Sequence, residues 1–471
     1  MSNRKKRKIY TSLTNGPLSR SIWRLAIPMM IGAFLQNLFT LADLFFVGKL
    51  GYIAVAAISI ADVILGFLIM VVMGVSSGAT VLISHFIGKQ EYENADSVLF
   101  QIIIISIFCA GAMICIGLFG TTWLLRLSGA TPAIIPVALE YLKISFLWSI
   151  FIFLLIGLSQ ALRGSGEAVF PLKVLIFSNL LNVALDPIFI FGWGFIPRME
   201  VAGSAIATII SEAVGVSLLL WHLLFGHSTL HFKKAVSRIN IAVISRIFKI
   251  GIFSSIEIFL RQVSILLLLY LVTSYGETYI AAFGIVTRLR LSVVMLGLGM
   301  GSACSVLIGQ NMGAGRPERA TQTAKLTLRY YEYMVIPLSV FFFIFSKSII
   351  SAFNVNPQVV ETGSTFLKFI AVTLPFLPPA LIFGLGVAGA GDTIAPAAMT
   401  GIFQLGLRIS IAYILSIIIQ LGTNGLWLGM NVSDICQGLA MFWYFNRGYW
   451  KKRYYQHRDA IEEENIALIK S

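Results

Sequence analysis

The feature that most constrains the fold is an internal repeat, in which the second half of the chain follows the first at a fixed offset of 225 positions. The offset holds without a gap from Gly51 to Pro171, and it joins glycines and prolines far more often than chance allows. Two structural halves with the same topology are therefore expected. The pairs include Gly51 with Gly276, Gly74 with Gly299, Gly88 with Gly313, Pro132 with Pro357, Gly164 with Gly389, Gly166 with Gly391 and Pro171 with Pro396.

The composition places both halves in a lipid bilayer. Of the 471 residues, 57% are hydrophobic and 12% are charged, whereas soluble domains carry about 25% charged residues. Counting about 20 apolar residues per crossing, we predict an all-α polytopic membrane protein with twelve transmembrane helices. They form two six-helix lobes related by a pseudo-two-fold axis along the membrane normal. The predicted spans are 22–47, 53–84, 97–120, 133–160, 169–192, 203–225, 245–274, 278–309, 322–350, 360–388, 394–420 and 424–446.

The distribution of basic residues predicts the orientation. The net charge of +14 could indicate nucleic-acid binding, but the bases cluster in tails and in loops on one side, as they do in cytoplasmic loops of membrane proteins. We therefore expect no nucleic-acid partner, both termini in the cytoplasm, and a multi-pass protein of the cell's inner (plasma) membrane. The predicted segments are an N-terminal tail (1–20), an N-lobe (21–226), a linker (227–244), a C-lobe (245–446) and a C-terminal tail (447–471).

Asp186 lies in the middle of the apolar segment 169–191. A carboxylate there costs roughly 2.5–3.5 kcal/mol on insertion scales, so it indicates a function. Asn179 and Asn182 lie at helical spacing from Asp186 and share its face, and Pro187 invites a kink that frees backbone carbonyls. Such an oxygen-rich break in a membrane helix suits a small cation or a proton.

The two halves differ at these polar positions. The counterparts of Asp43, Asn182 and Asp186 in the second half are Leu268, Leu407 and Ile411. The architecture does not require the acids, which favours a functional role. Further polar stripes predict a pocket in the N-lobe; they consist of Gln36, Thr40 and Asp43 in the first span, and Ser204, Thr208 and Ser211 in the sixth.

The second half carries mostly basic residues in its spans, among them Arg261, Arg290 and Arg408. Glu257 and Arg261 are four residues apart and can form an ion pair on one helix face. Two interpretations stay open for this pair: it stabilises the helix, or it lines the cavity and contacts substrate.

Six stretches stand out together in this sequence: Ala26–Pro28, Ala42–Gly51, Asn182–Gly192, Gly309–Arg316, Arg163–Gly166 and Ala390–Thr393. They resemble the multidrug and toxic compound extrusion (MATE) transporters, in their DinF-like branch. The resemblance covers about residues 15–450. It implies that Asp43, Asn182, Asp186 and Thr208 form a cation-responsive site, which would hold Na⁺ if the transporter is sodium-coupled, and that the first helix bends at Pro28.

We therefore expect a secondary active multidrug exporter that exchanges organic compounds for H⁺ or Na⁺ by alternating access. Its substrate cavity is predicted to include Gln36, Thr40, Asn179, Glu257 and Arg261. No phosphate-binding loop or catalytic constellation occurs in the sequence, so we expect a non-enzyme without a cofactor, acting as a monomer on small molecules. The alternative is a flippase for lipids or lipid-linked oligosaccharides, which shares the two-lobe plan.

Overall fold

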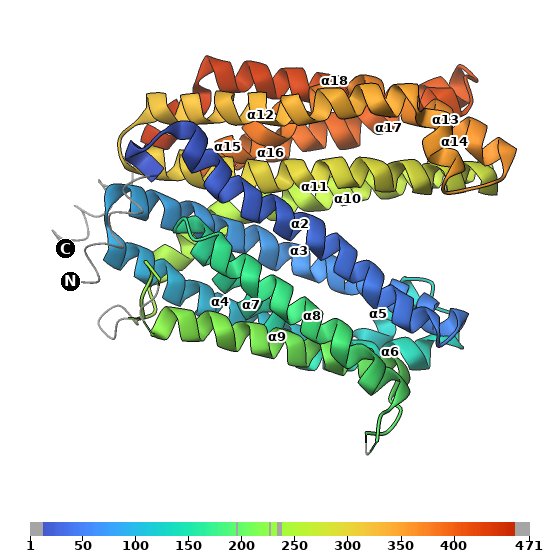
Figure 1. Cartoon of the computed structure of the whole chain (residues 1–471), viewed down its shortest axis with the longest axis horizontal. Coiled ribbons are helices and arrows are strands. Elements are labelled where there is room, and N and C mark those ends of the chain that lie inside the picture. Colours follow the sequence, from blue (N-terminus) through green and yellow to red (C-terminus); the bar gives the residue numbers. More distant parts are fainter. Residues whose placement is uncertain (1–12, 195, 226–227, 233–237, 457–471) are drawn as a thin grey trace. The chain divides into compact units, whose positions relative to one another are not determined.

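The computed structural model describes residues 13–194, 196–225, 228–232 and 238–456 (Figure 1). Most of the predicted N-terminal tail and the end of the predicted C-terminal tail lie outside these residues. The described chain forms two compact units: unit 1 contains residues 31–255, and unit 2 contains residues 13–30 and 256–456. Two helices, α2 (Leu18–Gly48) and α10 (Ile241–Thr273), each contribute residues to both units.

Unit 1 is built around the second part of α2 and the first part of α10. Within it, α8 and α9 pack along one another, and α3 packs against α4, α6 and α7. Buried aliphatic side chains from α3, α4, α7 and α9 form its main core, with Leu99, Ile102, Leu158 and Leu219 fully enclosed. The other helices of unit 1 are α3 (Tyr52–Lys89), α4 (Tyr92–Phe119), α5 (Thr121–Leu127), α6 (Ile134–Leu147), α7 (Ser149–Gly164), α8 (Val169–Phe191) and α9 (Glu200–Leu224).

Unit 2 repeats this order with a more aromatic core, in which Phe366 stacks on Trp427 with ring centroids 3.7 Å apart. Two π-helical segments, Thr400–Leu407 and Ile414–Ile418, flank α17. The remaining α-helices are α11 (Glu277–Gly313), α12 (Pro317–Ile344), α13 (Ser346–Ser351), α14 (Pro357–Thr373), α15 (Gly384–Gly389), α16 (Ile394–Met399), α17 (Arg408–Tyr413) and α18 (Thr423–Arg447).

The structure confirms the repeat at the level of helix boundaries. Helix α12 begins and ends 225 positions after α4. The boundary between the units follows the same offset of 225 positions. It falls between Met30 and Ile31 in α2, and between Ser255 and Ile256 in α10. The shared helices are thus divided at equivalent points of the two repeats.

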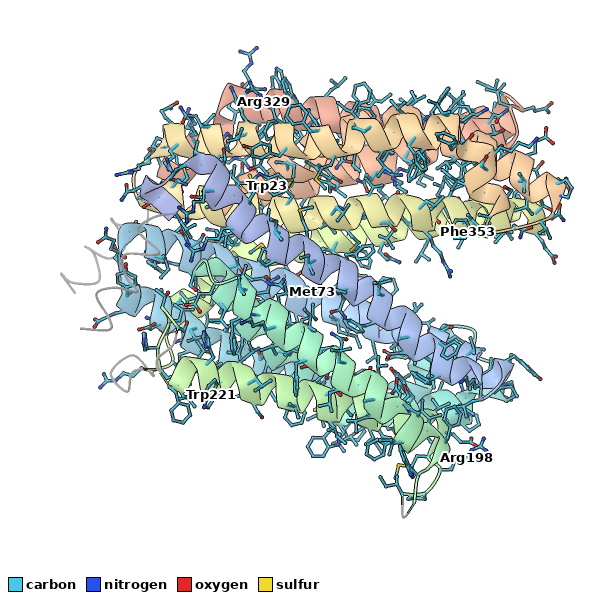
Figure 2. All side chains as sticks on the ribbon, viewed as in Figure 1. Trp23, Met73, Arg198, Trp221, Arg329 and Phe353 are labelled. Atoms are coloured by element: carbon cyan, nitrogen blue, oxygen red, sulfur yellow. The ribbon has the colours of Figure 1, made fainter. Side chains whose placement is uncertain are left out.

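The helices confirm the all-α membrane fold, with no strand among the described residues. Nine helices of the described chain are long and apolar enough to cross a membrane, and the pair α6 and α7, bent by 53°, makes a tenth span. Helices α12 and α18 lie at the repeat positions of α4 and α9 but are not among these apolar helices, so the predicted count of twelve spans stays a prediction. Large apolar side chains on the spans, such as Trp221 on α9, point outward (Figure 2), as lipid-facing residues do.

Two predicted spans are interrupted rather than continuous. The predicted span 133–160 breaks between α6 and α7, and no proline accounts for this break. The predicted span 360–388 contains a 3₁₀ turn and a π-helical segment, Leu374–Phe376 and Pro379–Phe383. Pro375, Pro378 and Pro379 explain this second interruption, because each removes a backbone donor.

Glycines mark where the shared helices pack most closely. Gly74 of α3 faces the backbone of Ser255 in unit 1, and its repeat counterpart Gly299 of α11 faces the backbone of Met30 in unit 2. A Cβ atom at either glycine would lie under 3.0 Å from backbone atoms of the facing helix. Only glycine therefore allows this approach, and the two halves use it at equivalent positions.

Candidate functional site

Unit 1 brings together the four residues that the sequence predicts for a cation site. Asn182 and Asp186 lie one turn apart on α8, Asp43 lies on α2, and Thr208 lies on the neighbouring helix α9. Asp186 is fully buried and Asn182 is 5% exposed, whereas Asp43 and Thr208 are half-buried. Three helices thus converge on one polar cluster, although its residues are up to 165 positions apart in the sequence.

Asn182 links the cluster. In the amide orientation that satisfies its neighbours, Nδ2 donates to Asp43 Oδ1 at 2.7 Å, and the amide oxygen lies 3.3 Å from both the hydroxyl and the backbone nitrogen of Thr208. With the amide turned over, Nδ2 donates to Thr208 Oγ1 at 3.3 Å, and the amide oxygen then needs a proton on Asp43. The same side chain can therefore serve both an ionised and a protonated Asp43.

Asp186 differs from the other residues of the polar cluster because both of its carboxylate oxygens are buried without a donor in the described part of the chain. Its carboxyl group and that of Asp43 lie within hydrogen-bonding reach of each other. Apart from a proton shared between these two acids, no donor from the described residues reaches either Asp186 oxygen. A buried carboxylate without partners is costly, so the cluster needs a proton or a cation to compensate it.

A metal ion at this cluster would also need neutral oxygen ligands. The described part of the chain contains no group of three or more His, Cys, Asp or Glu side chains placed to hold a metal ion. The oxygens of Asn182 and Thr208 would complete the two carboxylates. An oxygen-only set of this kind suits a hard cation rather than a transition metal.

The structure places the other predicted residues of unit 1 as follows. Asn179 is half-buried and donates from Nδ2 to the Leu175 carbonyl at 2.7 Å. Gln36 is exposed, and the side chain of Thr40 lies outside the described part of the structure. Asp62, a further acid within the predicted span 53–84, is exposed on α3 rather than buried. The roles of Gln36, Thr40 and Asn179 in a substrate cavity stay predictions.

Pro28, the predicted bend point, is buried inside α2 and lies two residues before the end of the unit 2 portion of this helix. Its ring leaves the carbonyl of Arg24 without an intrahelical donor. The weakened position thus lies close to the point where α2 passes from one unit to the other.

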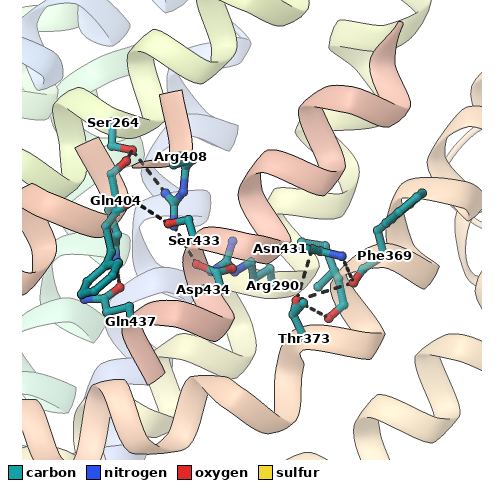
Figure 3. A network of polar contacts seen from close by, with 12 residues as sticks. Ser264, Arg290, Phe369, Thr373, Gln404, Arg408, Asn431, Ser433, Asp434 and Gln437 are labelled. Carbon is teal, nitrogen blue, oxygen red and sulfur yellow. Dashed lines mark hydrogen bonds and ion pairs between the residues drawn. The ribbon is translucent and has the colours of Figure 1, made fainter. Parts of the chain in front are cut away.

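In unit 2, Glu257 and Arg261 form the expected ion pair at 2.6 Å. Sequence reasoning missed a second group, in which Asp434 bonds both Arg290 and Arg408 at 2.7 Å (Figure 3). The arginines stood out as charges within apolar spans, but their common partner was not apparent, because Arg290 and Asp434 are 144 positions apart.

Sequence reasoning also missed two buried acids at the turns before the fifth helix of each repeat. Glu167 binds His222, Ser228 and Thr229 at distances between 2.6 and 3.0 Å. Its repeat counterpart Asp392 accepts hydrogen bonds from Tyr444 and Arg453. Each acid follows a glycine with φ near +95°, Gly166 or Gly391, a conformation that favours glycine.

These acids hold the segment that leaves the last helix of each repeat. Ser228 and Arg453 are themselves 225 positions apart. Asp96 Oδ1 further accepts a hydrogen bond from the backbone of His231 at 2.8 Å, and Gln101 binds the backbone of Arg238 and Asn240. The described part of the predicted linker is therefore docked on unit 1 by polar side chains.

The fold and the polar cluster define a class: a multi-pass transporter of two repeated units with acids inside its spans. Comparison with known families agrees, since the sequence profile of the MatE family matches residues 28–188 and 254–414, once in each repeat. The chain belongs to the MATE family of membrane transporters.

Relatives of known name match almost the whole chain. The probable multidrug resistance protein YoeA of Bacillus subtilis is 26% identical, over 92% of this chain and 95% of its own. The FAD transporter of Shewanella oneidensis is 25% identical, over 92% of this chain and 96% of its own. A crystal structure described as MATE in the bent conformation has a TM-score of 0.88 at 23% identity, covering 94% of this chain and 99% of that one.

Proposed function

We propose that the protein is a secondary active exporter of the inner (plasma) membrane that exchanges organic compounds for H⁺ or Na⁺, with both termini in the cytoplasm. The family and the names of its relatives support export of small molecules. Basic residues concentrated at the termini and in the linker support this orientation.

The observation that carries the coupling is Asp186. It is fully buried in a membrane helix, and neither of its oxygens has a donor among the described residues unless it shares a proton with Asp43. Two carboxylates this close cannot both remain ionised in a low dielectric without a compensating charge. An incoming proton or sodium ion supplies that charge, so the occupancy of this pair changes with the ion gradient.

The rest of the cluster transmits the change. When Asp43 is neutralised, the amide of Asn182 turns over and exchanges one set of partners on α2 and α9 for another. The hydrogen bonds that join α2, α8 and α9 therefore differ between the two charge states. Helix α2 responds at Pro28, where its backbone ladder is already interrupted, and the substrate is released to the other side by alternating access.

The test is ion flux driven by substrate in proteoliposomes. We expect the wild type to move H⁺ or Na⁺ when substrate is added to the opposite side, and Asp186→Asn and Asp43→Asn to lower this flux by about tenfold or more, because a neutral amide needs no cation. Removing Na⁺ at fixed pH identifies the ion. Glu140→Gln, which changes an exposed acid of the same unit, should behave as the wild type. Full coupled export by both aspartate variants would disprove the coupling.

The flippase alternative has one observation in its favour, the arginines inside the spans of unit 2, which suit a phosphate head group. Scrambling of fluorescent phospholipids that is independent of H⁺ and Na⁺ would support it. Scrambling that is absent while ion-coupled export persists would exclude it.

A further inference from the structure

Unit 2 contains a buried group of charges with more positive than negative members. Asp434 on α18 lies between Arg290 on α11 and Arg408 on α17, with a 2.7 Å contact to each (Figure 3). The side chains are 6%, 14% and 3% exposed, respectively. One carboxylate therefore faces two guanidinium groups in the membrane interior.

The ion pair on α10 does not correct this imbalance. Arg261 and Glu257 on α10 neutralise each other at 2.6 Å, so the five charges sum to one excess positive charge. The buried Nε atoms of Arg408 and Arg261 have no acceptor among the described residues. An arginine in a bilayer span is costly unless an anion accompanies it, and neither of these two donors is compensated by the described residues.

The neutral side chains around the group supply no negative charge. Ser264 lies 3.3 Å from Arg408 Nη1 and donates its own hydrogen to the Gln404 carbonyl. Gln404 Nε2 donates to Gln437 Oε1 at 2.7 Å, and Gln437 in turn donates to Thr400. These residues hold one another in place, and none of these neutral side chains balances the excess positive charge.

The position of the group is informative, because two of its residues lie next to the repeat counterparts of cation-site residues of unit 1. Arg408 corresponds to Val183, which is adjacent to Asn182, and Asp434 corresponds to Ile209, which is adjacent to Thr208. Equivalent helices thus carry acids in unit 1 and arginines in unit 2. Further equivalent polar pairs are Asn179 with Gln404, Thr208 with Ser433, and Glu212 with Gln437.

The local backbone also differs in unit 2. Gln404 lies in the π-helical segment Thr400–Leu407, directly before Arg408, whereas its counterpart in unit 1 lies in the regular helix α8. Short π-helical segments occur frequently at functional sites. This segment changes the helical register in front of Arg408.

We propose that Arg290, Arg408 and Arg261 bind an oxyanion group, a carboxylate or a phosphate, of the transported organic substrate, while Asp434 partly neutralises Arg290 and Arg408. The proposal rests on the proposed export function and names its substrate class. Arginine suits this role because its planar fork binds carboxylate and phosphate in a bidentate manner.

The test is equilibrium binding to the full-length protein in phosphatidylcholine nanodiscs, without an ion gradient. The probes are fluorescein, which carries a carboxylate, 1-naphthyl phosphate, and the cation rhodamine 6G. We expect at least one of the two anions to bind about tenfold tighter than the cation, and Arg290→Gln or Arg408→Gln to remove that preference. The anion that binds more tightly identifies the group. Lys368→Gln, which alters an exposed lysine of the same unit, should leave the preference unchanged.

The ratio of anion to cation affinity separates binding from folding, since a folding defect lowers both equally. Arg408→Lys should keep part of the preference, and Asp434→Asn, which frees both arginines, should raise it several-fold. Equal losses for all probes, or a fall in the ratio with Asp434→Asn, would overturn the proposal. Loss of probe binding when phosphatidylglycerol is added would assign the site to a lipid head group instead, and would also overturn it.

The outcomes remain distinguishable from those of the coupling test. Because the binding assay uses no gradient, an anion preference can be measured even if Asp186 plays no part in coupling. Conversely, ion-coupled export of both anions that is unaffected by the arginine variants would preserve the proposed function and exclude this inference.

Discussion

At the scale of single residues, the glycines Gly74 and Gly299 have the most direct consequence. Each faces the backbone of a shared helix, and an added Cβ would lie under 3.0 Å from it. Backbone atoms cannot move aside as a flexible side-chain end can, so even one added methyl group strains this packing.

We predict that Gly74→Ala and Gly299→Ala each destabilise the protein by about 1–3 kcal/mol, seen as a lower unfolding temperature in detergent. The matched controls are Gly66→Ala in α3 and Gly284→Ala in α11, where an added Cβ would meet nothing within 4 Å. These should be neutral or slightly stabilising, because alanine favours helices by up to about 1 kcal/mol over glycine. Equal effects at all four positions would contradict the close-approach argument.

At the scale of elements, the turn between α7 and α8 has a charge-dependent role. Burial, which raises the pKa of Glu167, is outweighed by the hydrogen bonds from His222, Thr229 and Ser228, so this pKa lies below its ordinary value. The carboxylate therefore stabilises the folded state at pH values above the pKa of this group in the unfolded chain, about 4.3. This stabilisation is lost as the pH falls through the lower pKa that the group has in the folded state.

We predict that Glu167→Gln lowers stability at pH 7 by about 1–3 kcal/mol and reduces the loss of stability below about pH 4.3. Unfolding temperatures of wild type and variant between pH 3 and pH 8 would measure this, and the two curves should converge at the acidic end. Glu361→Gln, at an exposed position, should follow the wild type at every pH. A constant offset between the Glu167→Gln and wild-type curves would refute the electrostatic explanation.

The elements also show how much the sequence can predict. The long apolar segments and the 225-residue offset predicted the helices and the two repeats, because hydropathy and repetition are properties of the chain itself. The acids Asp43 and Asp186 stood out because a charged side chain inside a membrane span is energetically costly. The break between α6 and α7 could not be predicted, because no proline lies at it. The partners of Asp434 could not be predicted either, because they depend on packing between segments that are distant in the sequence. Glu167 and Asp392 could have been found, since they are counterparts at the same offset.

At the scale of the whole molecule, the two units differ in the sign of their in-span charge, and under the proposed exchange the charge of the substrate determines the energetics. One cation entering down about 100 mV supplies roughly 2.3 kcal/mol, which is about 40-fold in concentration at 1.4 kcal/mol per tenfold. A monovalent cation leaving in exchange cancels this contribution. A monovalent anion leaving doubles it to about 4.6 kcal/mol.

We therefore predict that the voltage dependence of accumulation follows substrate charge, with anions most sensitive, neutral compounds intermediate and monovalent cations insensitive. Proteoliposomes clamped with potassium and valinomycin allow steady-state gradients to be measured at 0 and about 100 mV for each substrate. A voltage dependence that is the same for all three would rule out exchange of one cation per substrate molecule.

The sharing of α2 and α10 between the units bears on how such a chain could have arisen. A protein made of one repeat alone would have the first part of its first helix, but not the glycine-containing helix surface against which that part packs. In this chain, that surface belongs to the other repeat. Two copies of such an ancestor would have satisfied each other by exchanging these helix ends, as in a domain-swapped dimer. Gene duplication and fusion would then have made a pre-existing mutual dependence permanent.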